Sequence, residues 1–193
     1  MLTNQPLSLY IHIPWCVEKC PYCDFNSHAL SHKNDKNKQG LPESAYVIEL
    51  IKDLDSDIKR FKLQNRKLHT IFIGGGTPSL FSAPAIENLL TQVLARFEHD
   101  PSQDNDIEIT LEANPGTVEA EKFIGFFNGG VSRLSVGVQS FESDKLIKLG
   151  RIHNSQQAKT AAELADKCGV SSFNLDLMHG LPNQSIENAL DDI

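Results

Sequence analysis

The sequence predicts an α/β fold with one parallel sheet, and three observations lead to this fold class. Five short apolar segments have the composition of strands, amphipathic helical segments separate them, and the two kinds alternate along the 193 residues. Such alternation is typical of a parallel sheet covered by helices, either an open doubly wound sheet or a (β/α) barrel. The length corresponds to a single domain.

The predicted strands are short, rich in branched or alternating apolar residues, and each ends near Gly, Pro, Asn or Cys. They cover Leu7–Ile13, 70–73, 107–111, 133–138 and Ser172–Leu177. Between the first strand and the first helix, residues 31–40 contain no large apolar side chain and predict a solvated loop.

Helices are predicted where apolar residues recur three or four positions apart. The first covers Glu43–Phe61 and the second covers 84–97. Thr117 is predicted to cap a third helix that stops at Gly129, and a fourth carries a stripe of alanines that closes at Gly169. A further helical pattern begins near the end of the sequence. Five strands leave a barrel unclosed, so we expect this chain to be a fragment.

The charge balance is acidic, with 18 Lys and Arg against 25 Asp and Glu and a net charge of −7. This disfavours nucleic acid and anionic lipid as partners, because both attract basic proteins. No stretch reaches the roughly 18–20 consecutive apolar residues that span a bilayer. The first residues carry no basic region of a secretory signal, so we expect a cytoplasmic protein.

Three of the four cysteines, Cys16, Cys20 and Cys23, form a Cys-x3-Cys-x2-Cys pattern directly after the first predicted strand. They lie too close together to cross-link distant parts of a fold. Three thiolates on one loop suit an iron–sulfur cluster in which one iron has no protein ligand. The alternatives are plain buried cysteines or a zinc-stabilised binding domain with His12 or His28 as fourth ligand, although the second cysteine pair of most structural zinc sites is missing.

Polar residues and glycines follow the other predicted strands, at the edge where the loops of an α/β barrel converge. The second strand runs into Gly74-Gly75-Gly76-Thr77-Pro78, whose missing side chains let a ligand lie against the backbone. Glu112, Gln139 and Asp176 end the next three strands, and we expect them at corresponding positions. Arg151 suits a bidentate contact with a carboxylate, or lies on the surface. The fourth cysteine, Cys168, lies in the alanine stripe and is expected in the core.

The cysteine pattern, with an aromatic residue just before its third cysteine, resembles the signature of the radical S-adenosylmethionine superfamily. The resemblance implies a partial parallel (β/α) barrel truncated after about five βα units, so that residues 1–193 form an incomplete radical SAM core domain. It also implies a [4Fe-4S] cluster on the three cysteines. S-adenosylmethionine would chelate the open iron and be cleaved to methionine and a 5'-deoxyadenosyl radical, with electrons from a donor protein.

The segments YIHIPWC, CPYCDFN, GGGTP, EANPGT, GVQSF, LGR and NLDLMHGLP resemble one subgroup of this superfamily over residues 7–193. That subgroup contains the oxygen-independent coproporphyrinogen III dehydrogenase and a related family of heme chaperones. The resemblance implies that the backbone at Tyr22 helps to hold the adenine. It implies an S-adenosylmethionine site at the matching positions Tyr10, Gly75, Gly76, Thr77, Glu112, Gln139, Arg151 and Asp176.

Two departures separate the sequence from the dehydrogenase and match the chaperones. Phe25 stands where the dehydrogenase has a fourth cysteine, and only 15 residues precede Cys16. We therefore expect a protein that binds heme and transfers it to an acceptor protein, which could itself be membrane-bound. Oxidative decarboxylation of coproporphyrinogen III to protoporphyrinogen IX is the alternative activity. None of the seven histidines lies in a recognisable heme motif, so the heme site is not predicted.

Overall fold

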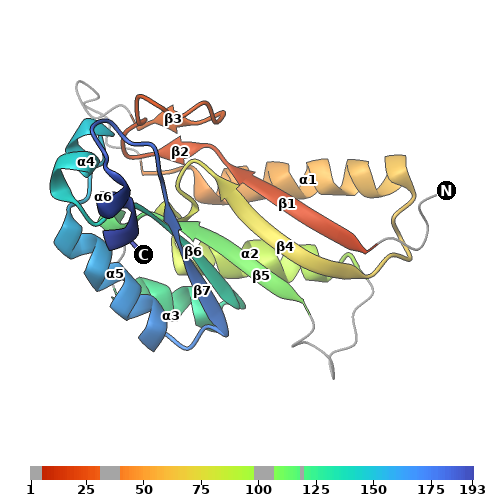
Figure 1. Cartoon of the computed structure of the whole chain (residues 1–193). Coiled ribbons are helices and arrows are strands. Elements are labelled where there is room, and N and C mark those ends of the chain that lie inside the picture. Colours follow the sequence, from red (N-terminus) through yellow and green to blue (C-terminus); the bar gives the residue numbers. More distant parts are fainter. Residues whose placement is uncertain (1–5, 31–39, 98–106, 118–119) are drawn as a thin grey trace.

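Five parallel strands form the main sheet, and their order in space, β1-β4-β5-β6-β7, follows their order in the chain (Figure 1). The strands are β1 (Leu7–Ile13), β4 (Leu68–Gly75), β5 (Glu108–Ala113), β6 (Arg133–Gln139) and β7 (Ser172–Leu177). The computed structural model describes residues 6–30, 40–97, 107–117 and 120–193. The predicted loop over 31–40 lies outside the described residues except for Gly40.

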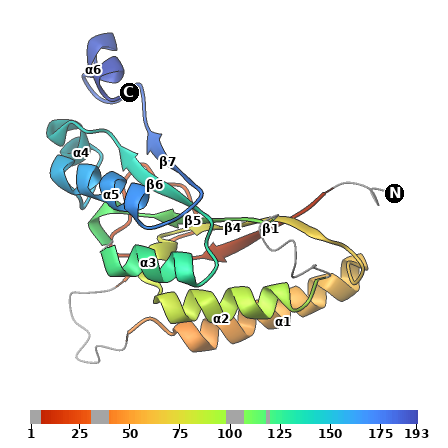
Figure 2. The ribbon, with the colours of Figure 1, turned by 90° about the horizontal axis from the view of Figure 1, so that it is seen from below.

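The strand order decides between the two α/β architectures. In a doubly wound sheet the order reverses at a switch point, whereas here each new strand adds to the same edge. Figure 2 shows α1 (Glu43–Phe61), α2 (Ala83–Leu94) and α3 (Ala120–Asn128) along one face of this sheet. Sequential strands with helices on one face are the arrangement of a (β/α) barrel. The predicted partial barrel with five strands is therefore confirmed.

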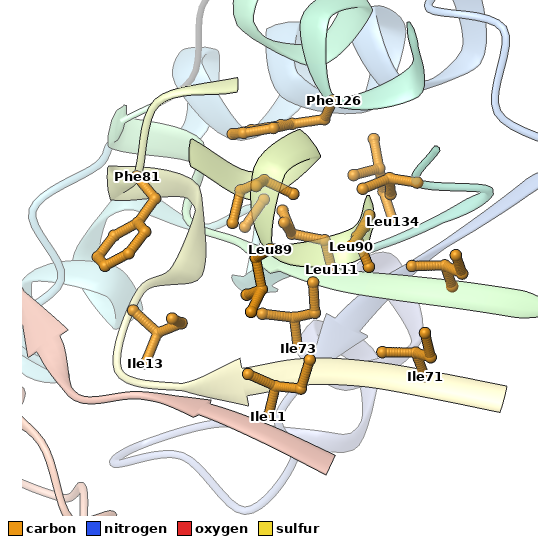
Figure 3. Close-up of a cluster of buried hydrophobic side chains, with 14 of the residues drawn as sticks. Ile11, Ile13, Ile71, Ile73, Phe81, Leu89, Leu90, Leu111, Phe126 and Leu134 are labelled. Carbon is orange, nitrogen blue, oxygen red and sulfur yellow. The ribbon is translucent and has the colours of Figure 1, made fainter. Parts of the chain in front are cut away.

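The core lies between the sheet and these helices, because alternate strand residues point to opposite faces. Ile11 and Ile13 of β1 are buried, whereas Tyr10, which directly precedes Ile11, is exposed. Figure 3 shows the strand residues Ile11, Ile13, Ile71, Ile73, Leu111 and Leu134 with Leu89 and Leu90 of α2 and Phe126 of α3. The apolar residues thus occupy the helix-covered face, and the opposite face of the sheet keeps the polar residues of the same strands.

Most predicted helices are present, with two differences at their ends. α2 begins one residue earlier than predicted because Ser82 caps it, accepting a hydrogen bond from the Ala85 N–H at 3.3 Å. It ends at Leu94, yet Phe97 still reaches the core. The prediction that Thr117 caps α3 is wrong. Thr117 lies in the short 3₁₀ turn Pro115–Thr117, where its hydroxyl donates to the Asn114 carbonyl at 3.0 Å.

The remaining helices are α4 (Ser143–Lys148), α5 (Ser155–Lys167) and α6 (Ile186–Asp191). α4 escaped prediction because its six residues are too few to display a helical period. α5 buries the predicted stripe of Ala158, Ala161 and Ala165, and Cys168 at its end is buried as expected. Within the described ranges, no helix is long and apolar enough to span a bilayer.

Candidate functional site

A cavity of about 320 Å³ lies at the C-terminal ends of the strands, between them and the cysteine segment. Small-molecule sites have volumes of about 300–1,000 Å³, so the cavity is large enough for a ligand. It is lined by every predicted site residue except Tyr10, namely Cys16, Cys20, Tyr22, Cys23, Gly75, Gly76, Thr77, Glu112, Gln139, Arg151 and Asp176. Residues from distant parts of the sequence therefore meet at this edge of the sheet.

The cysteine segment is held as a closed loop beside the end of β1. Its ends pair as the short strands β2 (Trp15–Cys16) and β3 (His28–Ala29). The Leu30 N–H donates to the Cys16 carbonyl at 2.8 Å, and the Cys23 N–H donates to the Cys20 carbonyl at 3.1 Å. All three thiols are free, with Cys16 buried and the other two half-buried. The loop thus presents three thiols to one wall of the cavity.

His12 does not serve as a fourth zinc ligand, because both of its ring nitrogens have other partners. Nε2–H donates to the Asn26 carbonyl at 2.8 Å, and Nδ1 accepts from the Tyr10 hydroxyl at 3.1 Å. His28 is exposed on β3. Among the residues that the structure describes, no three His, Cys, Asp or Glu side chains gather around a single ion position.

Gly75, the last residue of β4, and Gly76 after it allow the strand end to pack directly against the cysteine segment. A Cβ atom on Gly76 would lie 2.5 Å from the Trp15 carbonyl oxygen, and Gly75 has a φ of 116°. The Gly76 N–H donates to the Ile13 carbonyl at 2.7 Å, and the Thr77 N–H donates to that of Trp15 at 2.7 Å. The glycines also line the cavity, as expected. The sequence did not reveal that they also bring the protein's own backbone segments together.

Two carboxylates face the cavity from neighbouring parts of the sheet. Glu112 Oε2 accepts a hydrogen bond from the Gly75 N–H at 3.1 Å. Burial raises the pKa of Glu112, and the nearby negative charge of Asp176 raises it further. Asp176 accepts hydrogen bonds from the Ser135 hydroxyl at 2.9 Å and the Asn174 amide at 2.6 Å. Two acidic groups in one partly buried cavity favour a ligand that carries positive charge.

The prediction that Glu112, Gln139 and Asp176 hold corresponding positions is wrong in its register. Glu112 lies opposite Ser135, whereas Gln139 lies opposite Leu177. The register shifts between Val136 and Gln139, and Gln139 has a φ of 70°, which is rare for a residue with a side chain. The irregular end of β6 nevertheless brings Gln139 to the cavity that Glu112 and Asp176 line.

His153 holds this irregular strand end through a hydrogen bond to the backbone. Its Nε2–H donates to the Val138 carbonyl at 3.0 Å, next to Gln139. Burial and the nearby Arg151 charge lower the pKa of His153 to about 4, so the ring is neutral at physiological pH. His153 is thus a buried structural histidine at the margin of the site.

Arg151 joins the strand ends to the cysteine loop and is not a surface arginine. Its Nη2 donates to the Gly137 carbonyl at 2.7 Å, while Nη1 lies 3.6 Å from Cys20 Sγ and 3.4 Å from the Tyr22 hydroxyl. Its Nε is buried and has no hydrogen-bond partner within the described part of the chain. Arg151 thus lines the cavity while its guanidinium links the end of β6 to the cysteine loop.

Tyr10 is the one predicted site residue that does not line the cavity. Its side chain is 57% exposed, and its ring stacks on that of Phe72 at 6.2 Å between centroids. Burial and the charge of Glu112 raise its pKa. Tyr10 precedes buried Ile11 and Glu112 follows buried Leu111, so both lie on the face of the sheet opposite the core.

Sequence reasoning missed Ser135, Gly137 and Asn174, which support or line the site. A signal for them was present. β6 has the sequence RLSVGVQ and β7 the sequence SFNLDL, in which polar and apolar residues alternate. This period of two places Ser135 and Gly137 on the face opposite the core, together with Asn174 and Asp176.

Comparison of the sequence with models of known protein families identifies the family of this chain. The family model of the radical SAM superfamily matches residues 10–193. The chain belongs to the radical SAM superfamily. Membership implies a [4Fe-4S] cluster and S-adenosylmethionine as the cofactors of radical SAM proteins.

Curated relatives that carry the name heme chaperone HemW match nearly the whole chain. The protein from Haemophilus influenzae is 59% identical over 190 residues, which cover 97% of this chain and 47% of that protein. The protein from Escherichia coli is 57% identical over 193 residues, covering all of this chain and 48% of the relative. The chain thus spans about half the length of the curated relatives it matches.

Among solved structures, the chain resembles the radical SAM enzyme coproporphyrinogen III oxidase (HemN) from Escherichia coli. The two share 27% sequence identity with a TM-score of 0.79, over 98% of this chain and 41% of that one. Methylornithine synthase (PylB) shares the fold at 13% identity, with a TM-score of 0.59.

Proposed function

We propose that the protein is a heme chaperone of the radical SAM type, which binds heme and transfers it to an acceptor protein. The observation that carries the cofactor part is that three free cysteines and two carboxylates line one cavity. The strong similarity to the HemW relatives supports heme as the cargo. The acceptor and an electron donor are partners of the proposed function, and a cytoplasmic location stays a prediction.

The residues around the cavity fit the cofactors of the superfamily. Cys16, Cys20 and Cys23 would hold the cluster, because thiolates are its usual protein ligands. Arg151 lines the cavity, and its guanidinium suits the carboxylate of S-adenosylmethionine. When bound, the cluster and S-adenosylmethionine together supply one-electron chemistry.

The acidic and backbone groups fit the rest of S-adenosylmethionine. Glu112 and Asp176 provide acceptors for ribose hydroxyls or for the cationic sulfonium and amino groups. Thr77, Gln139 and the backbone of Tyr22 and Gly75 would complete the contacts. Tyr10, which faces the same side of the sheet, would approach from the open side. The role of these residues is to bind, orient and desolvate, while the cofactors carry the difficult chemistry.

The dehydrogenase remains the second candidate because of the similarity to HemN. The expectation against it depends on Phe25, which lines the mouth of the cavity with its side chain 61% exposed. Phe25 stands in place of the fourth cysteine of the dehydrogenase, and a phenylalanine has no thiol that could perform that cysteine's role.

A heme titration combined with an activity assay distinguishes the two candidates. We expect the anaerobically reconstituted protein to bind heme, with a shift of the heme absorption band, and to leave coproporphyrinogen III unchanged in the presence of S-adenosylmethionine and a reductant. Formation of protoporphyrinogen IX would overturn the chaperone proposal in favour of the dehydrogenase. Zinc without iron or sulfide in anaerobically purified protein would instead support a zinc-stabilised binding domain.

Glu112→Gln is expected to weaken S-adenosylmethionine binding while leaving the fold at least as stable. The substitution removes a charged acceptor, whose hydrogen bonds contribute about 1.5–3 kcal/mol, so the Kd should rise about 10- to 100-fold. Because the pKa of Glu112 is raised in the folded state, its contribution to stability is present at low pH and is lost as the pH rises through the raised value. Because glutamine does not ionise, the stability of Glu112→Gln should not fall with pH for this reason.

Calorimetric titration and thermal unfolding between pH 5 and pH 8 measure both effects. S-adenosylmethionine binding by the unsubstituted protein should weaken as the pH falls through the raised pKa of Glu112, and this part of the pH dependence should be absent from Glu112→Gln. Glu163→Gln, on the exposed side of α5, is the matched control and should change neither quantity. Equal affinity in Glu112→Gln would contradict the assigned role.

A further inference from the structure

A directed chain of hydrogen bonds crosses the open face of β6 and β7 and ends on Asp176. Arg133 Nη2 donates to Asn174 Oδ1 at 2.6 Å, and Asn174 Nδ2 donates to Asp176 Oδ1 at 2.6 Å. Asn174 Nδ2 also donates to the Ser135 hydroxyl at 3.2 Å, and that hydroxyl donates to Asp176 Oδ2 at 2.9 Å. Each carboxylate oxygen of Asp176 therefore receives one donor from within the protein.

The direction of these hydrogen bonds follows from the chemistry of Arg133, where they begin. An arginine side chain can only donate, so the oxygen of the Asn174 amide must face Arg133. The amide nitrogen is then turned towards Asp176 and Ser135. Because Ser135 accepts from that nitrogen, its single proton is left for Asp176. If the Asn174 amide were reversed, its oxygen would face the carboxylate and the chain would break.

The strand pairing makes this arrangement possible. Ser135 lies opposite Asn174 in the parallel register, and Arg133 lies opposite Ser172, so that the alternate residues of both strands share one face. Asp176 and Ser135 line the cavity, whereas Arg133 and Asn174 do not. These two residues can therefore influence a bound ligand only through the groups that do reach it.

We propose that Arg133, Asn174 and Ser135 are positioning residues that fix the carboxylate of Asp176 for ligand binding. The inference depends on the proposed binding of S-adenosylmethionine at this cavity. With one internal donor on each oxygen, the carboxylate cannot rotate freely, and its remaining lone pairs are available to the hydroxyl or ammonium donors of the ligand. The geometry assigns Arg133 to orient Asn174, and Asn174 to orient Asp176.

A double-mutant cycle, in which S-adenosylmethionine is titrated into the anaerobically reconstituted protein, tests this series of hydrogen bonds. We expect Asn174→Ala to raise the Kd about tenfold, since it removes a hydrogen bond to the charged Asp176, and Arg133→Ala about threefold, since it removes the charged donor that orients Asn174. In the Asn174→Ala background, the additional Arg133→Ala change should alter the Kd by less than about twofold, because Arg133 then has no amide to orient.

Arg133 also approaches Glu108, with Nη1 3.9 Å from Oε1, and this pair supplies the competing explanation. If Arg133 acted through Glu108 or through the fold alone, its threefold effect would persist in the Asn174→Ala background, and the proposal would be overturned. Iron and sulfide content and the unfolding midpoint, measured on every variant, separate changes in Kd from a loss of cluster or fold.

Ser8→Ala is the matched control. The Ser8 hydroxyl accepts from Thr70 at 2.9 Å on the same sheet but is not connected to Asp176. We expect it to bind S-adenosylmethionine as the unsubstituted protein does. Should Asn174→Ala fail to fold, Ser135→Ala decides, since it removes one donor to Asp176 and should raise the Kd severalfold. Absence of binding by the unsubstituted protein would overturn the proposed function and this inference together, whereas unchanged affinity in the variants would overturn the inference alone.

Discussion

Cys20→Ala is expected to abolish the [4Fe-4S] signal of the anaerobically reconstituted protein. The cluster would depend on three thiolates from one short loop, and Cys20 Sγ lies half-buried at the cavity, 3.6 Å from Arg151 Nη1. Removing one of three ligands leaves two irons without protein thiolates, and no other cysteine of the cavity wall can replace it. Electron paramagnetic resonance of the reduced protein, with iron and sulfide analysis, measures the loss.

Cys168→Ala is the control that makes this result specific. Cys168 is buried at the end of α5, and its thiol donates to the Ala165 carbonyl at 3.3 Å, so it belongs to the core and not to the cavity. This variant should retain the full cluster signal and lose at most a little stability. An intact cluster in Cys20→Ala would refute the assignment of Cys20 as a ligand.

Gly76→Ala is expected both to destabilise the fold and to abolish tight binding of S-adenosylmethionine. The new Cβ would lie 2.5 Å from the Trp15 carbonyl oxygen and 3.0 Å from the Pro14 carbonyl carbon, so backbone segments would have to move apart. Overpacking of this kind costs about 1–3 kcal/mol. Because Gly76 and Cys16 line the same cavity, the displacement would also separate the two walls of the site.

Gly40→Ala controls for the general effect of replacing glycine by alanine. Apart from Gly40 and its two chain neighbours, no atom of the described residues lies within 4 Å of the Cβ position at Gly40. Only the entropy of the unfolded chain should therefore change, which favours alanine slightly. In chemical denaturation, the free energy of unfolding should therefore fall in Gly76→Ala and rise slightly in Gly40→Ala. In titration with S-adenosylmethionine, only Gly76→Ala should lose tight binding. Equal behaviour of Gly76→Ala and Gly40→Ala would show that the close packing of Gly76 has no energetic consequence.

Local patterns predicted the elements whose residues interact mainly with their neighbours in the chain or with one broad core. β1, α1 and β7 have the predicted bounds, because apolar residues recur along each of them with the period of a strand or a helix. α4 and the turn at Thr117 were beyond this reasoning. Six residues show no period, and the Thr117 hydroxyl binds the Asn114 carbonyl in place of a helix end.

The sequence by itself determined the fold class, the spacing of the three cysteines and eleven of the nineteen residues that line the cavity, since motif spacing and strand-end positions are local properties. Only the tertiary structure decided how those residues are held. The shifted register of Gln139, the link from Arg151 to Cys20 and the hydrogen-bond chain onto Asp176 join residues that are far apart in the chain. Such contacts depend on strand pairing and on the direction of individual hydrogen bonds, and no period in the sequence records either.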